Sequence, residues 1–98
     1  MSHATAATSR SQRPDIAEAL AEAVFSGHYA IGETIPREID LCERFGVSRS
    51  TVRSALQKLV NVGLLVRVSG QGTRVRELSA WHLLDPQVSA WMARYAQP

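Results

Sequence analysis

Three residues, Gly46, Val47 and Ser48, separate two short amphipathic segments and constrain the fold more than any other feature of the chain. Glycine ends a helix readily, and a serine side chain caps the start of the next one. Two helices, from about Arg37 to Arg44 and from Arg49 to Val62, joined by so tight a turn predict a helix-turn-helix. The residues expected to face inward are Leu41, Cys42, Phe45, Val52, Ala55, Leu56, Leu59 and Val60.

The flanking segments predict the rest of a small domain. An earlier helix is expected to begin near Pro14, which suits the first helical position, and to stop at Gly27, with a buried stripe of Ile16, Leu20, Ala23 and Val24. Residues 33–35 are a candidate short strand. Residues 64–68 are rich in β-formers, and the return from Thr73 to Arg76 follows a turn of Ser69, Gly70, Gln71 and Gly72, which predicts a hairpin.

This order of elements indicates an α+β, mostly helical fold. It is a winged helix-turn-helix of three helices plus a two-stranded wing, followed by a linker and a short C-terminal helix. We expect a flexible tail over residues 1–12, the winged domain over residues 13–77, and a linker with the start of a truncated effector-binding domain over residues 78–98. In the hairpin, Val75 is expected to face inward, and Arg74 and Arg76 outward.

The charge of the chain is unevenly distributed. Its net charge is +2, but residues 44–76 carry six arginines, Lys58 and no carboxylate, whereas residues 1–43 sum to −4 and residues 77–98 to −1. A block of 33 residues without an acid suggests a polyanionic partner, although a solvated basic surface without a ligand is the alternative.

The start of the helix from Arg49 carries the chemistry expected of a DNA reader. Arginine forks onto guanine O6 and N7 in the major groove, hydroxyls reach bases or phosphates, and backbone N–H groups at a helix start attract phosphate. Candidate contacts there are Ser48, Arg49, Ser50, Thr51, Arg53 and Gln57, with Arg44 and Lys58 better placed for phosphates than for bases. Candidate wing contacts to flanking backbone or minor groove are Arg67, Gly70, Gln71, Thr73 and Arg74, with Arg76 beside them.

The chain also resembles the N-terminal DNA-binding domain of the GntR family of bacterial transcription regulators. The motifs that carry the resemblance are residues 35–41 (IPREIDL), 45–56 (FGVSRSTVRSAL), 63–65 (GLL) and 70–75 (GQGTRV), and residues 81–91 are similar to the connector of the FadR-type subgroup. The resemblance implies a dimeric repressor or activator on a short palindromic operator, with contacts at Arg49, Ser50, Thr51, Arg53 and Gly70. It also implies a small-molecule effector, bound only by a C-terminal domain absent from this sequence. One position departs from the family: Ile39 stands where an arginine is usual, and an arginine lies instead two residues earlier, at Arg37. Either Arg37 reaches the same phosphates from another angle, or one base contact is lost.

Near the C-terminus, Asp85 and Pro86 predict a helix start. Leu84, Val88, Trp91, Met92 and Tyr95 then form an apolar stripe that needs a partner. The stripe has three possible fates: it folds back on its own domain, pairs with a second copy, or stays exposed. The surface through which the intact protein is expected to form dimers belongs largely to the missing domain. This chain is therefore expected to be monomeric or weakly self-associating.

Other functional classes receive little support. His3, His28, His82 and Cys42 are scattered, which predicts no metal site, and the chain has no Gly-rich phosphate loop or nucleophile motif, which predicts no cofactor and no enzyme activity. A single cysteine and the lack of a signal peptide or membrane span favour the cytoplasm. A winged helix that docks its basic face on an acidic protein is the alternative to DNA binding, because fold alone does not settle function.

Overall fold

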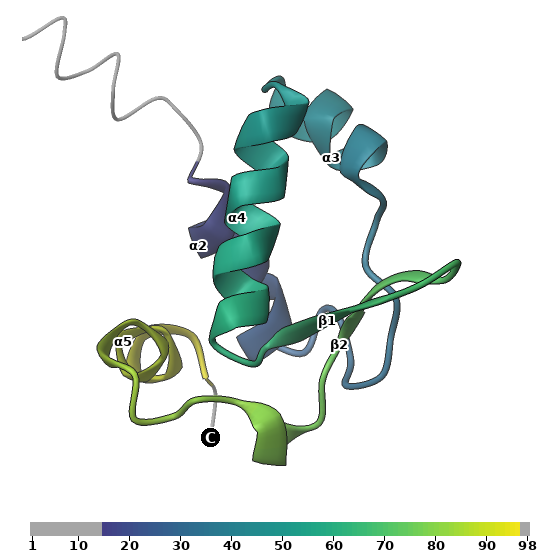
Figure 1. The fold of residues 1–98 in the computed structure, drawn as a ribbon. Helices are drawn as coiled ribbons and strands as arrows, with labels where there is room; N and C mark the ends of the chain where they lie inside the picture. Colours follow the sequence, from purple (N-terminus) through teal and green to yellow (C-terminus); the bar gives the residue numbers. More distant parts are fainter. Residues whose placement is uncertain (1–14, 97–98) are drawn as a thin grey trace, which may run out of the picture.

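The computed structural model describes residues 15–96, and its elements follow the predicted order (Figure 1). Three helices and a hairpin form the body of the domain, and a connector leads to a last helix. The bounds are α2 Ile16–Phe25, α3 Glu38–Phe45, α4 Arg49–Asn61, β1 Leu65–Val68, β2 Gly72–Val75, the 3-10 turn η1 Leu78–Ala80 and α5 Pro86–Tyr95. The predicted winged helix-turn-helix and the mostly helical α+β class are confirmed; the tail expected over residues 1–12 lies outside the described residues.

Helix α2 begins later than the sequence suggested. The Asp15 carboxylate accepts a hydrogen bond from the Glu18 backbone N–H at 3.1 Å, so Asp15 is the N-cap and Ile16 the first helical residue. The helix therefore begins two residues after Pro14, near which its start was expected, and the Asp15 side chain satisfies one of the free N–H groups of the first turn. Its buried face is wider than predicted, and consists of Ile16, Ala17, Leu20, Ala21 and Val24, with Ala23 half-buried.

The helix-turn-helix has the predicted turn. Arg37 has an extended backbone and is the N-cap residue of α3, without a side-chain capping bond, so this helix begins at Glu38 and not at Arg37. Gly46 takes the left-handed conformation with φ of 67°, which ends α3 at no steric cost to a residue without Cβ. The Ser48 hydroxyl then accepts a hydrogen bond from the Thr51 N–H at 3.3 Å and starts α4. The short turn holds α3 across the start of α4.

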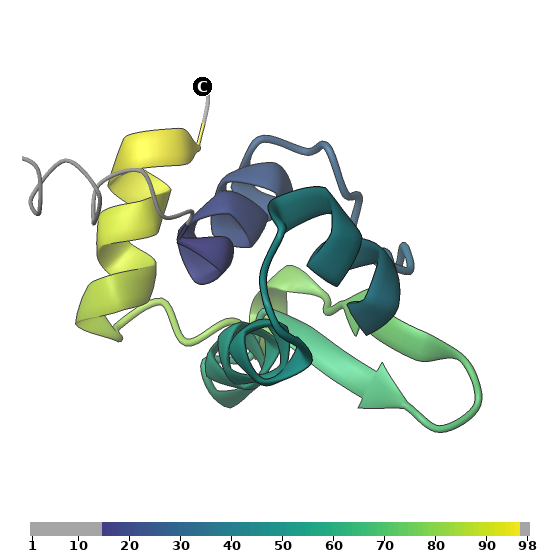
Figure 2. The same ribbon diagram turned by 90° about the horizontal axis from the view of Figure 1, so that it is seen from above.

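Helix α4 lies at the centre of the fold. Its inner residues Val52, Leu56 and Leu59 are buried and pack with Leu41 of α3 and the inner face of α2. Each large aliphatic side chain buried in this way contributes about 1.5–3 kcal/mol. Figure 2 looks along α4 and shows α5 on one side of the molecule and the hairpin extending on the other. The outer face of α4 is left to solvent.

The hairpin is joined to the body by a third extended segment. Strands β1 and β2 are antiparallel, with Leu65 paired to Val75 and Val68 to Gly72. The predicted strand over residues 33–35 is reduced to one bridge, Thr34 to Arg74, supported by bonds of 2.9 Å from Ile35 N to Thr73 O and 3.0 Å from Val75 N to Glu33 O. Val75 is buried as expected, but Arg74 is half-buried because this segment runs beside it.

The connector packs tightly against the end of α4. The His82 N–H donates to the Val62 carbonyl at 2.9 Å, and the Trp81 indole N–H donates to the Arg76 carbonyl at 2.9 Å. Gly63 lies directly beneath this segment, and a Cβ added there would come within 2.1 Å of the Ala80 carbonyl oxygen. The close approach explains a glycine at this position in addition to its positive φ of 82°.

Helix α5 folds back on α2, so its apolar stripe packs on its own domain, which is the first of the three alternatives. Val88 and Trp91 are buried, and Asp85 caps the helix as predicted. Leu84 does not belong to the stripe: it is 98% exposed, because it precedes the cap and the helix has not yet begun. The docking has a polar centre in the Glu18 carboxylate, which accepts hydrogen bonds from Trp91 Nε1 at 2.9 Å, Arg94 Nη1 at 2.6 Å and the Tyr95 hydroxyl.

Gly63→Ala should destabilise the chain by about 1–3 kcal/mol more than Gly27→Ala, as measured by urea denaturation. Both glycines have φ near +85°, but a Cβ at Gly27 meets no described atom within 4 Å, so the control isolates the clash with the connector. Equal losses from the two substitutions would contradict the close packing at Ala80.

Glu18→Gln should lower the free energy of unfolding by about 1 kcal/mol at pH 7. Hydrogen bonds from Tyr95, and then from Trp91 and Arg94, hold the pKa of Glu18 below its ordinary value of 4.5. The depressed pKa contributes stability that is complete above pH 4.5 and is lost as the pH falls through the folded-state value. Wild type and variant should therefore converge in a denaturation series as the pH falls below the folded-state pKa of Glu18; a gap that stays constant with pH would be the contrary result. Glu22→Gln, an exposed charge one turn along α2, is the matched control.

Candidate nucleic-acid interface

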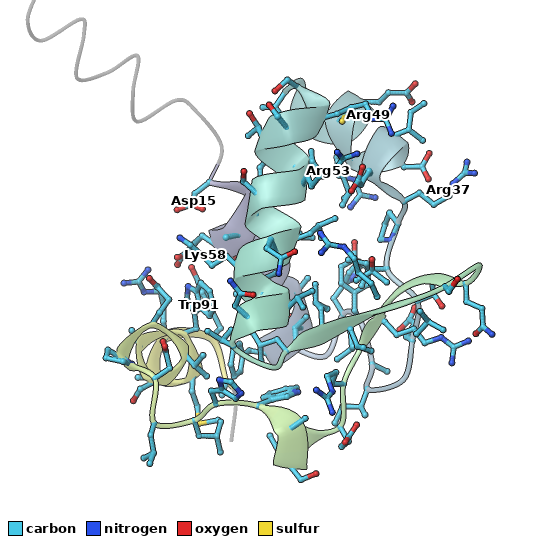
Figure 3. The ribbon with its side chains drawn as sticks, in the orientation of Figure 1. Asp15, Arg37, Arg49, Arg53, Lys58 and Trp91 are labelled. Carbon is cyan, nitrogen blue, oxygen red and sulfur yellow. The ribbon has the colours of Figure 1, made fainter. Side chains whose placement is uncertain are left out.

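The first two turns of α4 present a polar, basic surface to solvent. Arg49, Ser50, Thr51 and Arg53 are all exposed (Figure 3 labels the two arginines). The Ser48 hydroxyl lies 3.1 Å from that of Ser50 and 3.0 Å from that of Thr51. The helix start therefore carries a cluster of three hydroxyls beside two guanidinium groups, and backbone N–H groups with the positive end of the helix dipole lie beneath them.

Glu38 organises the two arginines. Its carboxylate accepts hydrogen bonds from Arg53 Nε at 3.3 Å and Nη2 at 3.2 Å, and it lies 3.8 Å from Arg49 Nη2. Two parallel bonds fix the plane of a guanidinium group as well as its position. The first helix of the helix-turn-helix thus orients side chains of the second.

The charge pattern of the sequence does not predict this contact, because attention falls on the block of residues without an acid. Glu38 precedes the block of residues 44–76 and belongs to the part of the chain that sums to −4. To predict this contact from the sequence, one would need to know how the first turn of α3 packs against the first turns of α4. The tight turn over residues 46–48 indicates that the two helices are adjacent, but not which of their side chains meet.

The electrostatics follow the geometry. The hydrogen bonds from Arg53 hold the pKa of Glu38 below its ordinary value of 4.5, with smaller contributions from the charges of Arg53, Arg49 and Arg67. In the same pair, Glu38 raises the pKa of Arg53. Both groups are therefore ionised at neutral pH, and the outward edge of Arg53 is available to a further acceptor, since guanidinium has five N–H donors.

The hairpin continues this surface. Arg67 of β1 donates to the Gln57 side-chain oxygen on α4, and Arg74 donates to that of Gln71 at the hairpin turn. A groove of about 340 Å³ separates the hairpin from the start of α3; it is lined by Arg37, Glu38, Arg67, Val68, Ser69, Gly70, Gly72 and Thr73. The groove therefore brings together three predicted wing residues, Arg67, Gly70 and Thr73, and Arg37 of the segment before α3. The predicted residues of α4 do not line it, and Gln57 is connected to it through its hydrogen bond with Arg67. Arg74 is half-buried.

Three predicted residues lie at the edge of this surface or away from it. Arg37 is exposed and forms an ion pair with Asp40 at 3.4 Å (Figure 3). Arg44 donates to the buried Tyr29 hydroxyl at 3.3 Å, so it also has a structural contact. Lys58 is five residues from Arg53, about 140° around the helix, and lies on the side of α4 that faces away from the hairpin in Figure 3.

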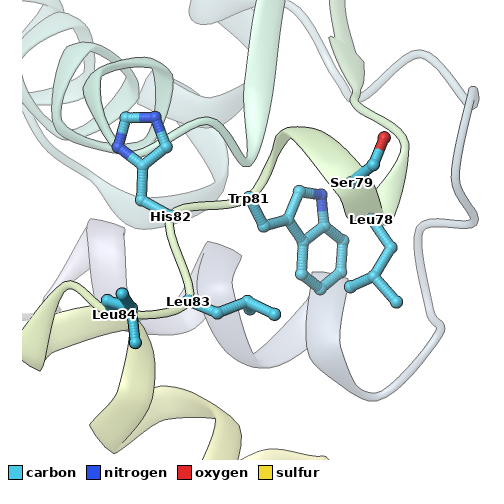
Figure 4. A pocket seen from close by; sticks show the side chains of 6 residues that line it. All are labelled: Leu78, Ser79, Trp81, His82, Leu83 and Leu84. Atoms are coloured by element: carbon cyan, nitrogen blue, oxygen red, sulfur yellow. The ribbon is translucent and has the colours of Figure 1, made fainter.

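A second hollow has a different character. It measures about 590 Å³, lies along the connector and is lined by Leu78, Ser79, Trp81, His82, Leu83 and Leu84 (Figure 4). The lining contains no arginine or lysine and is mostly apolar, so the hollow does not suit a polyanion. Within residues 15–96, no three His, Cys, Asp or Glu side chains gather where they would hold a metal ion, and no helix is long and apolar enough to cross a membrane.

The fold is a helix-turn-helix followed by a hairpin, and arginines stand at the start of the second helix of the motif. The chain is therefore a winged helix-turn-helix domain. Residues 12–75 match the family described as bacterial regulatory proteins, gntR family. The match covers more than half of the chain, and the protein therefore belongs to the gntR family. This confirms the family predicted from the sequence, and a family of regulatory proteins agrees with the expectation that the chain is not an enzyme.

Relatives and solved structures agree with this assignment. The HTH-type transcriptional regulator YieP of Escherichia coli is 41% identical over 76 residues, which cover 78% of this chain and 33% of YieP. The histidine utilization repressor of Klebsiella aerogenes is 42% identical over 62 residues, 63% of this chain and 26% of the repressor. The DNA-binding domain of AraR, solved in complex with its operator ORR3, superposes with a TM-score of 0.60 at 40% identity, over 61% of this chain and 72% of that one. The chain spans about a third or less of the length of these curated relatives.

Arg53→Ala should raise the pKa of Glu38 more than Arg49→Ala does, because Arg53 contributes both hydrogen bonds and the larger share of the charge interaction. The pKa is measured from the carboxyl 13C shift of Glu38 in an NMR titration. Glu18, which bonds to α5, serves as the internal control and should keep its titration curve. A larger change in the Arg49 variant would show that Glu38 pairs chiefly with Arg49.

Proposed function

We propose that this chain binds double-stranded DNA in a sequence-specific manner, as the DNA-binding part of a bacterial transcription regulator. The recognition helix α4 enters the major groove and the hairpin follows the flanking backbone or minor groove. The observation that carries the proposal is the pairing of Glu38 with Arg53 beside the exposed hydroxyls of α4. On a solvated helix face, holding a guanidinium group in one plane brings little benefit. An arginine that reads a base does benefit, because its two N–H donors must be oriented toward the base edge.

The residues divide by the kind of contact that they can make. Arg49 and Arg53 are assigned to guanine edges, and Ser50 and Thr51 to bases or phosphates. Ser48, Arg37, Arg44 and Lys58 are assigned to phosphates, with Gln57 at the inner edge of the surface. In the wing, the backbone of Gly70 allows close approach, and the remaining wing contacts are Arg67, Gln71, Thr73 and Arg74.

The solved relatives support the same partner. The AraR domain that superposes on this chain is described in complex with operators, and several relatives are described as repressors. We infer from them, and from the exposed α4 surface, that the intact regulator is a repressor or activator on a palindromic operator in the cytoplasm. Two copies are needed because one domain of this size covers only a half-site.

We also propose how this domain is connected to the rest of the regulator. Residues 13–77 form the DNA-binding unit, and residues 78–98 link it to an effector-binding domain of the FadR type, through which a small molecule acts. The FadR-type assignment rests on residues 81–91, which form the connector and the start of α5. In the structure the connector packs against the end of α4 and α5 packs against α2, so the effector domain would be attached to the DNA-binding unit through a fixed element.

The proposal is tested by selecting duplexes from a random library with the wild-type chain and then titrating variants by fluorescence anisotropy at two salt concentrations. Arg49→Ala and Arg53→Ala should each weaken binding to the selected duplex by about fivefold to a hundredfold and relax its sequence at one base pair. Affinity for a scrambled duplex should fall much less. Binding of wild type should weaken steeply as salt rises.

Arg94→Ala is the matched control, because Arg94 and Arg53 have the same side-chain exposure, 61%, and each pairs with a glutamate. Arg94 lies on α5 and its loss should leave sequence selectivity unchanged. The proposal fails if both α4 variants bind the selected duplex as wild type does. It also fails if the chain ignores duplexes at low salt and binds an acidic polyglutamate peptide instead, which is the result expected of a protein-docking winged helix.

A further inference from the structure

One large apolar side chain lies exposed in the first turn of α3, next in sequence to the glutamate that pairs with Arg53. Ile39 is 53% exposed and belongs to the first turn of α3. Its sequence neighbour Glu38 holds Arg53, and Arg37, one residue further back, lines the groove between α3 and the hairpin. Three exposed leucines, at positions 78, 83 and 84, lie instead along the connector hollow.

Helix geometry directs Ile39 away from the core. It is two residues from the buried Leu41, which places the two side chains about 160° apart around α3. Ile39 is not among the side chains that pack against the core cluster, whereas Cys42 and Phe45 of the same helix are. The side chain therefore has its apolar surface available on the solvent side of the helix, next to the glutamate that orients the reading arginines.

The chemistry of the major groove limits what an isoleucine can recognise there. Base edges present hydrogen-bond donors and acceptors, which an aliphatic side chain cannot satisfy, and one apolar group, the C5-methyl of thymine. We propose that Ile39 is a specificity-determining residue that reads a thymine methyl group at the edge of the half-site. This inference rests on the proposed function, and it adds an apolar contact from α3 to the polar contacts from α4.

The test combines a protein change with a base change. Deoxyuridine lacks only the C5-methyl of thymidine, so each thymine of the selected half-site is replaced by uracil in turn, and affinities are measured for wild type and Ile39→Ala. At one position, uracil should weaken wild-type binding by about threefold to tenfold, which is the scale expected for one buried methyl group. The same replacement should leave the affinity of Ile39→Ala unchanged.

Ile31→Ala is the control. Ile31 is 57% exposed, but it lies beside the base of the hairpin, where the next residue, Gly32, donates to the Val75 carbonyl. This variant should respond to uracil as wild type does. Ile39 is exposed, so its replacement by alanine should leave the fold intact, and an unchanged denaturation midpoint verifies this.

The outcomes separate this inference from the proposed function. If wild type selects a duplex but every uracil replacement affects wild type and Ile39→Ala equally, the contact with thymine is refuted while DNA reading by α4 stands. A selected half-site without thymine in either strand refutes it as well. If wild type selects no sequence at all, both the proposed function and the role of Ile39 fail.

Discussion

The burial of one face of α4 is the constraint on which the rest of the structure depends. Val52, Leu56 and Leu59 lie within the core and together contribute several kcal/mol, at about 1.5–3 kcal/mol for each side chain. Because these residues recur at helical spacing, their burial fixes the rotation of α4 about its own axis. That rotation leaves Arg49, Ser50 and Arg53 facing solvent. The same hydrophobic contacts that stabilise the domain therefore determine which side chains reach a ligand.

Two further contacts extend this rigidity to the surface. Glu38 reaches from α3 to hold Arg53, and Arg67 reaches from the hairpin to Gln57 on α4. Neither exposed pair is expected to stabilise the fold strongly, because ion pairs in water contribute little. Their effect is to limit the conformations of long side chains before a ligand arrives, which reduces the entropy lost on binding. The carboxylate also limits the net positive charge of the surface and so moderates attachment to DNA of any sequence.

Much of the fold could be predicted from the sequence, and the reasons are local. Gly46 and Ser48 stop one helix and start the next through their own backbone and side-chain chemistry, and the Gly70–Gly72 turn does the same for the hairpin. Contacts between distant residues could not be predicted in this way. The Glu18 carboxylate meets Trp91 across 73 residues, so the docking of α5 was one of three open alternatives. The pairing of Glu38 with Arg53 was missed for the same reason, and Leu84 was misassigned because periodicity alone does not show that a helix has yet to begin.

The exposed face of α4 and the hairpin are together the proposed surface for a DNA duplex. The most direct measurement is the change in backbone amide shifts of the 15N-labelled chain when a selected duplex is added in NMR. Large changes are expected over residues 48–57 and 67–74, and small ones over α5 and the connector. Changes concentrated in residues 78–95, with the start of α4 unaffected, would contradict it and would place the binding surface on the connector side of the molecule.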